Sequence, residues 1–292
     1  MRLSLKIHRN LRGMSMNIHW KKSIFKINDI YGSETDFSTK EKADVYCYFQ
    51  QPDYKDAHKK SSLHKKVKTL CIDLELTEDQ LRKEMNRTTR YQINKAGRDS
   101  LRVEQIKHPT KQDIREFSLF FNEFAKEKGI EKTRDDKLEA LRITKQVLIS
   151  YVLHENGKKL ASHLYIVTKK RATMFYSASA RFEEEQMKPI EIGRANRYLH
   201  WQDILFFKER QYQFYDFLGI SQEANNQEQQ NINKFKKGFG GKEVTEYQSY
   251  VPHTIKGTIM LFILRWLWRN QAELVKRKYI EKSKQLDSKL LD

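Results

Sequence analysis

The order of apolar and polar residues predicts strands and helices that follow one another in short succession. Alternation between the two kinds of residue is typical of a strand and predicts one at Leu70–Leu74 and another at Leu101–Ile106. Between these strands, Thr77 and Gln80 have the spacing of a capping box, in which side chains satisfy the free N–H groups of a first helical turn. A single helix is therefore expected from there to about Ala96.

A second helix is predicted to begin at Thr110 and to end before Gly129. Its apolar residues recur at helical spacing and form one stripe, which is typical of a core-facing helix: Ile114, Phe117, Phe120, Phe121 and Phe124. A further helix is expected at Asp136–Lys145.

The clearest local signal is a β-hairpin. Two runs rich in β-forming residues, Val147–His154 and Leu160–Val167, are separated by a short segment that contains Asn156 and Gly157. Asn-Gly favours a turn with positive φ at both central residues. Ala172–Ser179 is predicted to add a third neighbouring strand.

The remaining elements alternate between helix and strand. The pattern predicts them at residues 190–209 (helix), Phe214–Leu218 (strand), Glu228–Lys237 (helix) and Glu243–Tyr250 (strand), with a long basic helix from about Thr254. Helices followed by a β-meander and then by further helix and strand pairs predict a mixed α/β layer fold.

Composition shifts divide this pattern into three regions. Residues 1–68 are rich in lysine and carry short extended segments at Asn17–Trp20, Ile24–Ile27 and Val45–Phe49, which predicts a small β-rich subdomain. Residues 69–252 form the predicted main α/β domain, and residues 253–292 the basic amphipathic C-terminal helix.

The charge is strongly basic. There are 56 basic and 38 acidic residues, for a net charge of +18, and 16 Phe, 14 Tyr and 4 Trp indicate a folded chain. Such a charge favours polyanionic partners, whether nucleic acid, an anionic membrane surface or phosphorylated substrates, and it is equally compatible with a solvated basic surface.

Cysteine use and hydropathy bear on the compartment. Cys47 and Cys71 each lie in an apolar run without a neighbouring cysteine, which favours buried thiols in a reducing compartment. The N-terminus lacks an apolar signal segment, and the longest apolar run, Ile259–Leu264, is too short to span a bilayer. A cytoplasmic protein is expected, with peripheral contact at the inner face of the membrane as an option. The nine histidines show no metal-ligand spacing.

One segment has the features of an anion site. A short strand ends at Gly219, and a polar loop and a short helix follow, ending in Phe235-Lys236-Lys237-Gly238-Phe239-Gly240-Gly241. This order can place a cation and several backbone N–H groups beside an anionic substrate or a developing oxyanion.

The same segments resemble an enzyme family. Thr173–Ser179, a helix with Tyr198 and Trp201, then Tyr215–Ile220 and Phe235–Gly241 occur in the order found in the Fem-type aminoacyltransferases, which build the interpeptide bridge of peptidoglycan. The resemblance covers roughly residues 70 to 252 and implies a GNAT-like acyltransferase fold, with an incomplete first domain before it.

The resemblance also implies roles for particular residues. Lys236 would stabilise charge during acyl transfer, the alternative being a solvated lysine favoured by the helix dipole. Asp216 would orient the attacking amine or accept its proton, or else simply pair with a neighbouring lysine. Gly219 would permit a turn or a close backbone approach.

Further substrate contacts are expected on two elements. Arg90, Tyr91 and Lys95 lie on one helix, where the resemblance implies a contact to a pyrophosphate, although an exposed basic helix face is the alternative. On the strand, Tyr176 and Ser177 point to opposite faces, so only one of them is expected to line the acceptor cleft. Phe235 and Gly219 belong to the same predicted substrate-binding set.

These observations predict an amide-forming acyltransferase that moves an aminoacyl group from aminoacyl-tRNA to an amine of a peptidoglycan precursor. No metal or other cofactor is expected, since aminoacyl-tRNA or acyl-coenzyme A would be the donor substrate. Gly193 and Ala195 only partly match the motif with which many GNAT enzymes bind coenzyme A, because Ile190 stands where Gln or Arg is usual.

Two alternatives stay open. One is an acyl-coenzyme A-dependent N-acyltransferase that acts on an amino sugar of a surface polysaccharide. The other is a non-catalytic GNAT-like module that binds RNA or membrane through its basic face. The transferred group, the acceptor and the oligomeric state are not determined by the sequence.

Overall fold

The computed structural model describes residues 16–32, 42–56, 59–180 and 188–275. Its contacts divide the chain into two units, and each is discontinuous in sequence. The first contains the described residues up to Thr69, then Gly219–Gln227, and then those from Val244 onward; the second contains Leu70–Leu218 and Glu228–Glu243. The contiguous division into residues 1–68, 69–252 and 253–292 stays a prediction about independently folding parts.

The first unit is mainly a β-sheet. Its strands are β1 (Met16–Lys22), β2 (Phe25–Tyr31), β3 (Val45–Gln51) and parts of β10 (Lys242–Pro252) and β4 (Leu63–Asp73), in the order β1-β2-β3-β10-β4. β1 and β2 form an antiparallel pair, β2 runs parallel to β3, and β3 is antiparallel to β10. The β-rich character predicted for this part of the chain is confirmed.

The first unit also contains helix α8 (Ile255–Leu267), which begins at Thr254, whose side chain accepts a hydrogen bond from the N–H of Gly257. This helix is 13 residues long. The expected long basic helix is therefore wrong over residues 268–275, which contain turns, and residues 276–292 lie outside the described part. Among the described residues, no helix combines the length and the apolar character needed to cross a bilayer.

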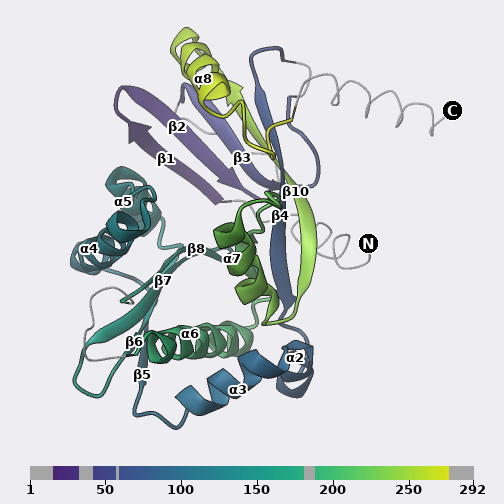
Figure 1. Cartoon of the computed structure of the whole chain (residues 1–292). Coiled ribbons are helices and arrows are strands. Elements are labelled where there is room, and N and C mark those ends of the chain that lie inside the picture. The colour runs from purple at the N-terminus through teal and green to yellow at the C-terminus, as the bar shows by residue number, and fades with distance from the viewer. Residues whose placement is uncertain (1–15, 33–41, 57–58, 181–187, 276–292) are drawn as a thin grey trace, which may run out of the picture. The chain divides into compact units, whose positions relative to one another are not determined.

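The second unit is a mixed α/β layer fold (Figure 1). Its strands follow the order β4-β9-β8-β7-β6-β5, with β5 (Arg102–Ile106), β6 (Val147–Leu153), β7 (Lys159–Val167), β8 (Arg171–Ser179) and β9 (Phe214–Gly219). β5 to β8 are antiparallel neighbours, and β8 runs parallel to β9. Its helices are α2 (Glu78–Glu84), α3 (Arg87–Ala96), α4 (Lys111–Lys128), α5 (Asp135–Ile143), α6 (Pro189–Glu209) and α7 (Gln227–Lys237).

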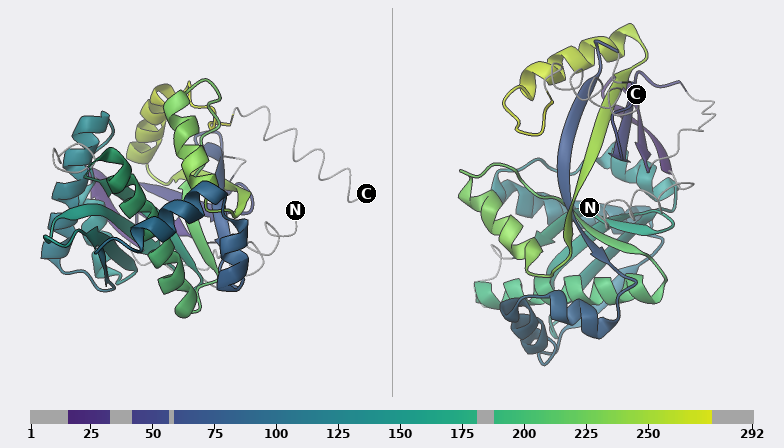
Figure 2. Two further views of the ribbon diagram at one scale, coloured as in Figure 1. Left: turned by 60° about the horizontal axis from the view of Figure 1, so that its bottom comes forward. Right: turned by 90° about the vertical axis from the view of Figure 1, so that its right-hand side faces the viewer.

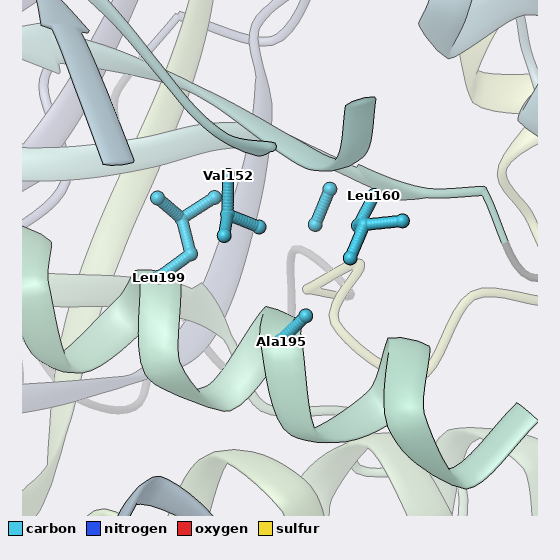
Figure 3. Packing of buried hydrophobic residues seen from close by; sticks show 5 residues of the cluster. Val152, Leu160, Ala195 and Leu199 are labelled. Carbon is cyan, nitrogen blue, oxygen red and sulfur yellow. The ribbon is translucent and has the colours of Figure 1, made fainter. Parts of the chain in front are cut away.

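Helices cover both faces of β6–β8. α4 and α5 lie on one face, α6 on the other, and α3 packs along the outer side of α6 (Figures 1 and 2). Between α6 and the sheet is a cluster of fully buried apolar side chains (Figure 3): Val152, Leu160, Ala161, Ala195 and Leu199. Burial of this cluster fixes α6 on the sheet, and α6 carries several of the polar residues described below.

Most predicted elements of this unit are present. The capping box of Thr77 and Gln80 is formed in both directions, and α4 runs from the Thr110 cap to Gly129, whose φ is 62°. The predicted single helix to Ala96 is wrong, because α2 ends at its C-cap Met85 and a separate helix, α3, follows its N-cap Asn86. The Asn86 side chain caps α3 by accepting from the N–H of Thr89 at 2.7 Å.

The hairpin between β6 and β7 has a different turn from the one expected. Gly157 has a φ of 83°, but Asn156 does not adopt a positive φ. The N–H of Gly157 donates to His154 O, and the N–H of His154 donates to Lys158 O. A three-residue loop with glycine in the left-handed position accounts for this pattern.

Candidate active site

The residues around Lys236 form the candidate site, all within the second unit. Lys236 lies in the last turn of α7, and its side chain is half-buried. Burial lowers its pKa to about 8, and the Asp216 carboxylate opposes part of this shift. A partly desolvated ammonium group titrates near neutral pH and is better placed than an exposed one to stabilise a developing negative charge.

Asp216 is held in a buried ion pair. Arg171 at the start of β8 and Asp216 on β9 are both fully buried, and Arg171 Nη2 lies 2.6 Å from Asp216 Oδ2. The other oxygen, Oδ1, accepts from the N–H of Leu218 at 2.8 Å. Of the two alternatives for Asp216, the geometry favours an ion pair, although its partner is an arginine and not the lysine that the sequence suggested.

The glycines of the Phe235–Gly241 segment are required by packing. A Cβ atom on Gly238 would lie 2.6 Å from Thr89 Oγ1, and one on Gly240 would lie 2.6 Å from Glu84 Cβ. Gly240 and Gly241 also have φ values of 83° and 80°. The segment therefore packs closely against the junction of α2 and α3.

The expected cradle of free N–H groups is not formed by this segment. The N–H of Gly238 donates to Lys234 O, that of Phe239 to Lys236 O, and that of Gly240 to Lys237 O. The N–H of Gly241 donates to a carboxylate oxygen of Glu84 at 3.2 Å. These donors are used within the protein, so the charge of Lys236 is the feature of the segment that can face a substrate.

A second cation lies close to the same place. The guanidinium group of Arg197 on α6 stacks over the Phe235 ring, 4.6 Å from its centroid. Arg197 and Lys236 both help to lower the pKa of His200, whose ring also packs against Phe235. No sequence pattern singles out Arg197, because only the packing of α6 against α7 brings it to Phe235.

A buried polar network lies beneath this region. Asp203 Oδ2 accepts hydrogen bonds from Ser150 Oγ and Tyr165 Oη, each at 2.7 Å, and lies 2.9 Å from His163 Nδ1. Tyr165 Oη contacts Tyr215 Oη at 2.8 Å.

The network ends at His200. Its Nδ1 lies 2.7 Å from Tyr215 Oη, and its ring packs against Phe235 and Phe239. Burial, together with the nearby His163, lowers the pKa of His200 well below the usual value, so its ring is neutral at physiological pH. The expectation that His163 and His200 are satisfied structural histidines agrees with these contacts.

The helix predicted to contact pyrophosphate is arranged differently from the expectation. Arg90 Nη1 donates to the carbonyl oxygens of Met85 at 2.6 Å and Arg82 at 3.0 Å, at the end of α2. Tyr91 and Lys95 are exposed. Arg90 thus stabilises the break between α2 and α3, and a substrate role for these three residues stays a prediction.

The two candidates on β8 do point to opposite faces. Ser177 pairs with His163 across β7 and β8 and shares the face of the sheet that carries the buried network. Tyr176 packs against Phe117 and Phe121 of α4 on the other face, and burial raises the pKa of its phenol. The structure therefore brings Ser177, and not Tyr176, to the face where α6 packs.

Gly219 does not have the backbone role proposed for it. Its φ is not positive, and a Cβ atom there would meet no other atom within 4 Å. The left-handed residue of this turn is Leu218, with a φ of 57°. A role of Gly219 in substrate binding stays a prediction.

Part of this chain is similar to a known protein family. Residues 132–249 match the model of the FemAB family. The resemblance to the Fem-type family is therefore confirmed over a segment that includes β6 to β9, α6, α7 and Lys236. The match supports an acyltransferase. Arg90, Tyr91 and Lys95 lie outside the matched residues.

Solved structures confirm the fold. The structure of FemX aligns with a TM-score of 0.56 at 12% sequence identity, over 89% of this chain and 92% of that chain. A second similar structure is the C-terminal domain (DUF2156) of an Agrobacterium fabrum protein that is named as a proposed lysylphosphatidylglycerol synthetase. It aligns with a TM-score of 0.52 at 14% identity, over 87% of this chain and 86% of that chain. A search of curated proteins found no significant match.

Proposed function

We propose that this protein transfers an aminoacyl group from aminoacyl-tRNA to an amine of a peptidoglycan precursor. The observation that carries the proposal is the half-buried ammonium group of Lys236, next to Asp216 and within the segment that matches the FemAB family. The amine nitrogen attacks the ester carbonyl, the tetrahedral oxyanion forms beside Lys236, and its collapse expels the ribose hydroxyl. The amine proton leaves with that hydroxyl or with solvent.

The neighbouring groups support this role of Lys236. The Arg171–Asp216 pair holds the Asp216 carboxylate near the ammonium group of Lys236. This negative charge offsets part of the decrease that burial causes in the pKa of Lys236. Arg197 adds a second positive charge beside Phe235. Two cations in a partly desolvated place suit a substrate that carries phosphates and an intermediate that carries an oxyanion.

The first turn of α6 favours aminoacyl-tRNA over acyl-coenzyme A as the donor. GNAT enzymes that bind coenzyme A place its pyrophosphate at a helix start, and Gly193 and Ala195 were the partial match for that site. Here a Glu191 carboxylate oxygen accepts from the N–H of Lys188, 3.1 Å away. A carboxylate at the helix start opposes a pyrophosphate at the same place.

A transfer assay with both donors tests the proposal. Labelled aminoacyl-tRNA and labelled acyl-coenzyme A are each incubated with the protein and a peptidoglycan precursor, and the amide product is measured. We expect product from aminoacyl-tRNA, a loss of about a hundredfold in kcat for Lys236→Met, and no change for Lys234→Met, an exposed lysine of the same helix. Product from acyl-coenzyme A alone would establish the N-acyltransferase alternative, and no product with intact RNA binding would favour the non-catalytic module.

We further propose that the protein works at the cytoplasmic side of an anionic membrane, which it contacts through α8. Exposed apolar residues lie on this helix at helical spacing: Ile255, Ile259, Phe262, Ile263 and Trp266. Co-sedimentation with vesicles of anionic lipid tests the contact. Phe262→Asp should reduce binding severalfold, and Leu119→Asp, at an exposed apolar residue of α4, should not. Equal binding of both variants would exclude α8 as the contact.

A further inference from the structure

A polar pocket lies on the outer side of α6, where α2 and α3 meet it. Its volume is about 330 Å³, at the lower end of the range of small-ligand sites. Its polar and aromatic lining residues are Arg82, Asn94, Arg98, Tyr198, Trp201 and Gln202. All of them belong to the second unit. None of the residues that line this pocket is acidic, and two are arginines.

On one wall of the pocket, Arg82 is held by several contacts. The guanidinium group of Arg82 stacks on the Trp201 ring, 4.6 Å from its centroid, and Trp201 is 1% exposed. Arg82 Nε also pairs with Glu78 at 3.0 Å, and Arg82 Nη1 donates to Asn94 Oδ1 at 3.3 Å. These contacts hold the cation in a fixed orientation, which lowers the entropic cost of binding an anion.

Three other polar side chains of the pocket are available to bind a ligand. In the part of the chain that the structure describes, no hydrogen bond or ion pair involves the side chains of Arg98, Tyr198 or Gln202. The amide nitrogen of Asn94 is a further donor, because its oxygen is the atom that accepts from Arg82. The pocket therefore gathers a guanidinium group, a phenol and two side-chain amides around a second, fixed guanidinium group.

We infer that this pocket binds a phosphate-bearing ligand of the size of one nucleotide. The two guanidinium groups supply positive charge and the forked donors that match a phosphate, and the amides and the phenol can bond to a sugar or a base. Tyr198 supplies an aromatic surface for a planar ring. The inference does not depend on the proposed aminoacyl transfer, because none of these residues belongs to the group around Lys236.

Calorimetric titration of the full chain with AMP, inorganic phosphate and adenosine tests the inference. We expect saturable binding of AMP at one site and weaker binding of phosphate. Adenosine should bind at least tenfold more weakly than AMP, because it lacks the charged group. Adenosine binding as tightly as AMP would overturn the inference, as would absence of AMP binding.

Charge-reversal variants locate the site. Arg98→Glu should weaken AMP binding at least tenfold without loss of folding, because this side chain is exposed and makes no hydrogen bond or ion pair within the described residues. Arg115→Glu makes the same charge change at an exposed residue of α4 and should change the affinity less than twofold. Equal losses in both variants would show that AMP responds only to net charge and would overturn the inference.

Two further arms separate this site from others. AMP binding that is lost in Lys236→Met and kept in Arg98→Glu would place the nucleotide at the candidate active site and overturn the inference, whatever the transfer assay shows. A single-stranded RNA tetramer without terminal phosphates identifies the source of the phosphate. Tighter binding of AMP than of the tetramer indicates a free nucleotide, and the reverse indicates a strand of RNA, provided that Arg98→Glu weakens both.

Discussion

Lys236, for which we propose a catalytic role, occupies a position that is costly for folding. Its ammonium group is half-buried, and burial is the main cause of its lowered pKa. In the unfolded chain the same group has its usual pKa of about 10.4, so folding at neutral pH moves a charged group into a less favourable environment. Such a cost is typical of sites where a charge serves function.

This cost predicts that Lys236→Met is stabilising at neutral pH. Between about pH 8 and 10.4 the unfolded state binds more protons at this residue than the folded state, so wild-type stability from Lys236 rises with pH. The gain from Lys236→Met should therefore be largest below pH 8 and should fade as the pH approaches 10.4. Thermal unfolding of both proteins at pH 7 and pH 10 measures it, and a variant less stable than wild type at pH 7 would contradict the cause assigned to the pKa.

Disruption of the buried Arg171–Asp216 pair should destabilise the protein, whereas Lys236→Met should stabilise it. Asp216→Asn leaves the fully buried Arg171 without its countercharge, and loss of one partner of such a pair destabilises by about 3 to 5 kcal/mol. Glu131→Gln, in the exposed pair with Arg134, should cost less than about 1 kcal/mol. Denaturant unfolding compares them, and near-equal midpoints would argue that Asp216 is retained for catalysis and not for stability.

At the scale of elements, the Phe235–Gly241 segment works through close packing and through Lys236. Its glycines allow the end of α7 to approach the junction of α2 and α3, which fixes Lys236 in place. The sequence predicted the helix, and it selected Lys236, whose catalytic role stays a prediction. It did not predict that the N–H groups are already bonded, because their partners become neighbours only when α7 docks.

Two glycine substitutions test this account. Gly240→Ala places a Cβ atom 2.6 Å from Glu84 Cβ and also forces alanine to a φ of 83°, so it should destabilise by more than about 1 kcal/mol. Gly219→Ala meets no atom within 4 Å and needs no positive φ, so it should be neutral or slightly stabilising. Melting temperatures compare the two, and equal effects would show that close approach is not the reason for Gly240.

The break between α2 and α3 shows where local pattern failed. The capping box of Thr77 and Gln80 predicts where a helix begins, and the sequence pattern predicts one helix from there to about Ala96. Asn86 caps the second helix, and Arg90 satisfies carbonyl groups at the end of the first. An asparagine four residues before an arginine is only a weak sequence signal for a break between two helices, and the close approach of Gly238 to Thr89 at this break is visible only in the tertiary structure.

At the scale of the whole molecule, the net charge of +18 is the property most relevant to partners. Binding of tRNA should therefore weaken at least tenfold between about 50 and 200 mM salt, because Lys and Arg contacts to phosphates release counterions. Filter binding at several salt concentrations measures the slope. A flat response would show that the positive surface is kept for solubility and does not contact RNA.

The sequence by itself determined most of the order of elements, the mixed α/β class and the resemblance to the Fem-type family, because hydrophobic period, capping residues and short motifs are local properties. It also singled out Lys236, since a cation between an aromatic residue and glycines is visible in the chain. Only the tertiary structure decided that Asp216 pairs with Arg171, that Arg197 stacks on Phe235, and that α2, α3 and α6 line a basic pocket. These groups are far apart in sequence, and side chains meet across such separations only when helices pack on a common sheet.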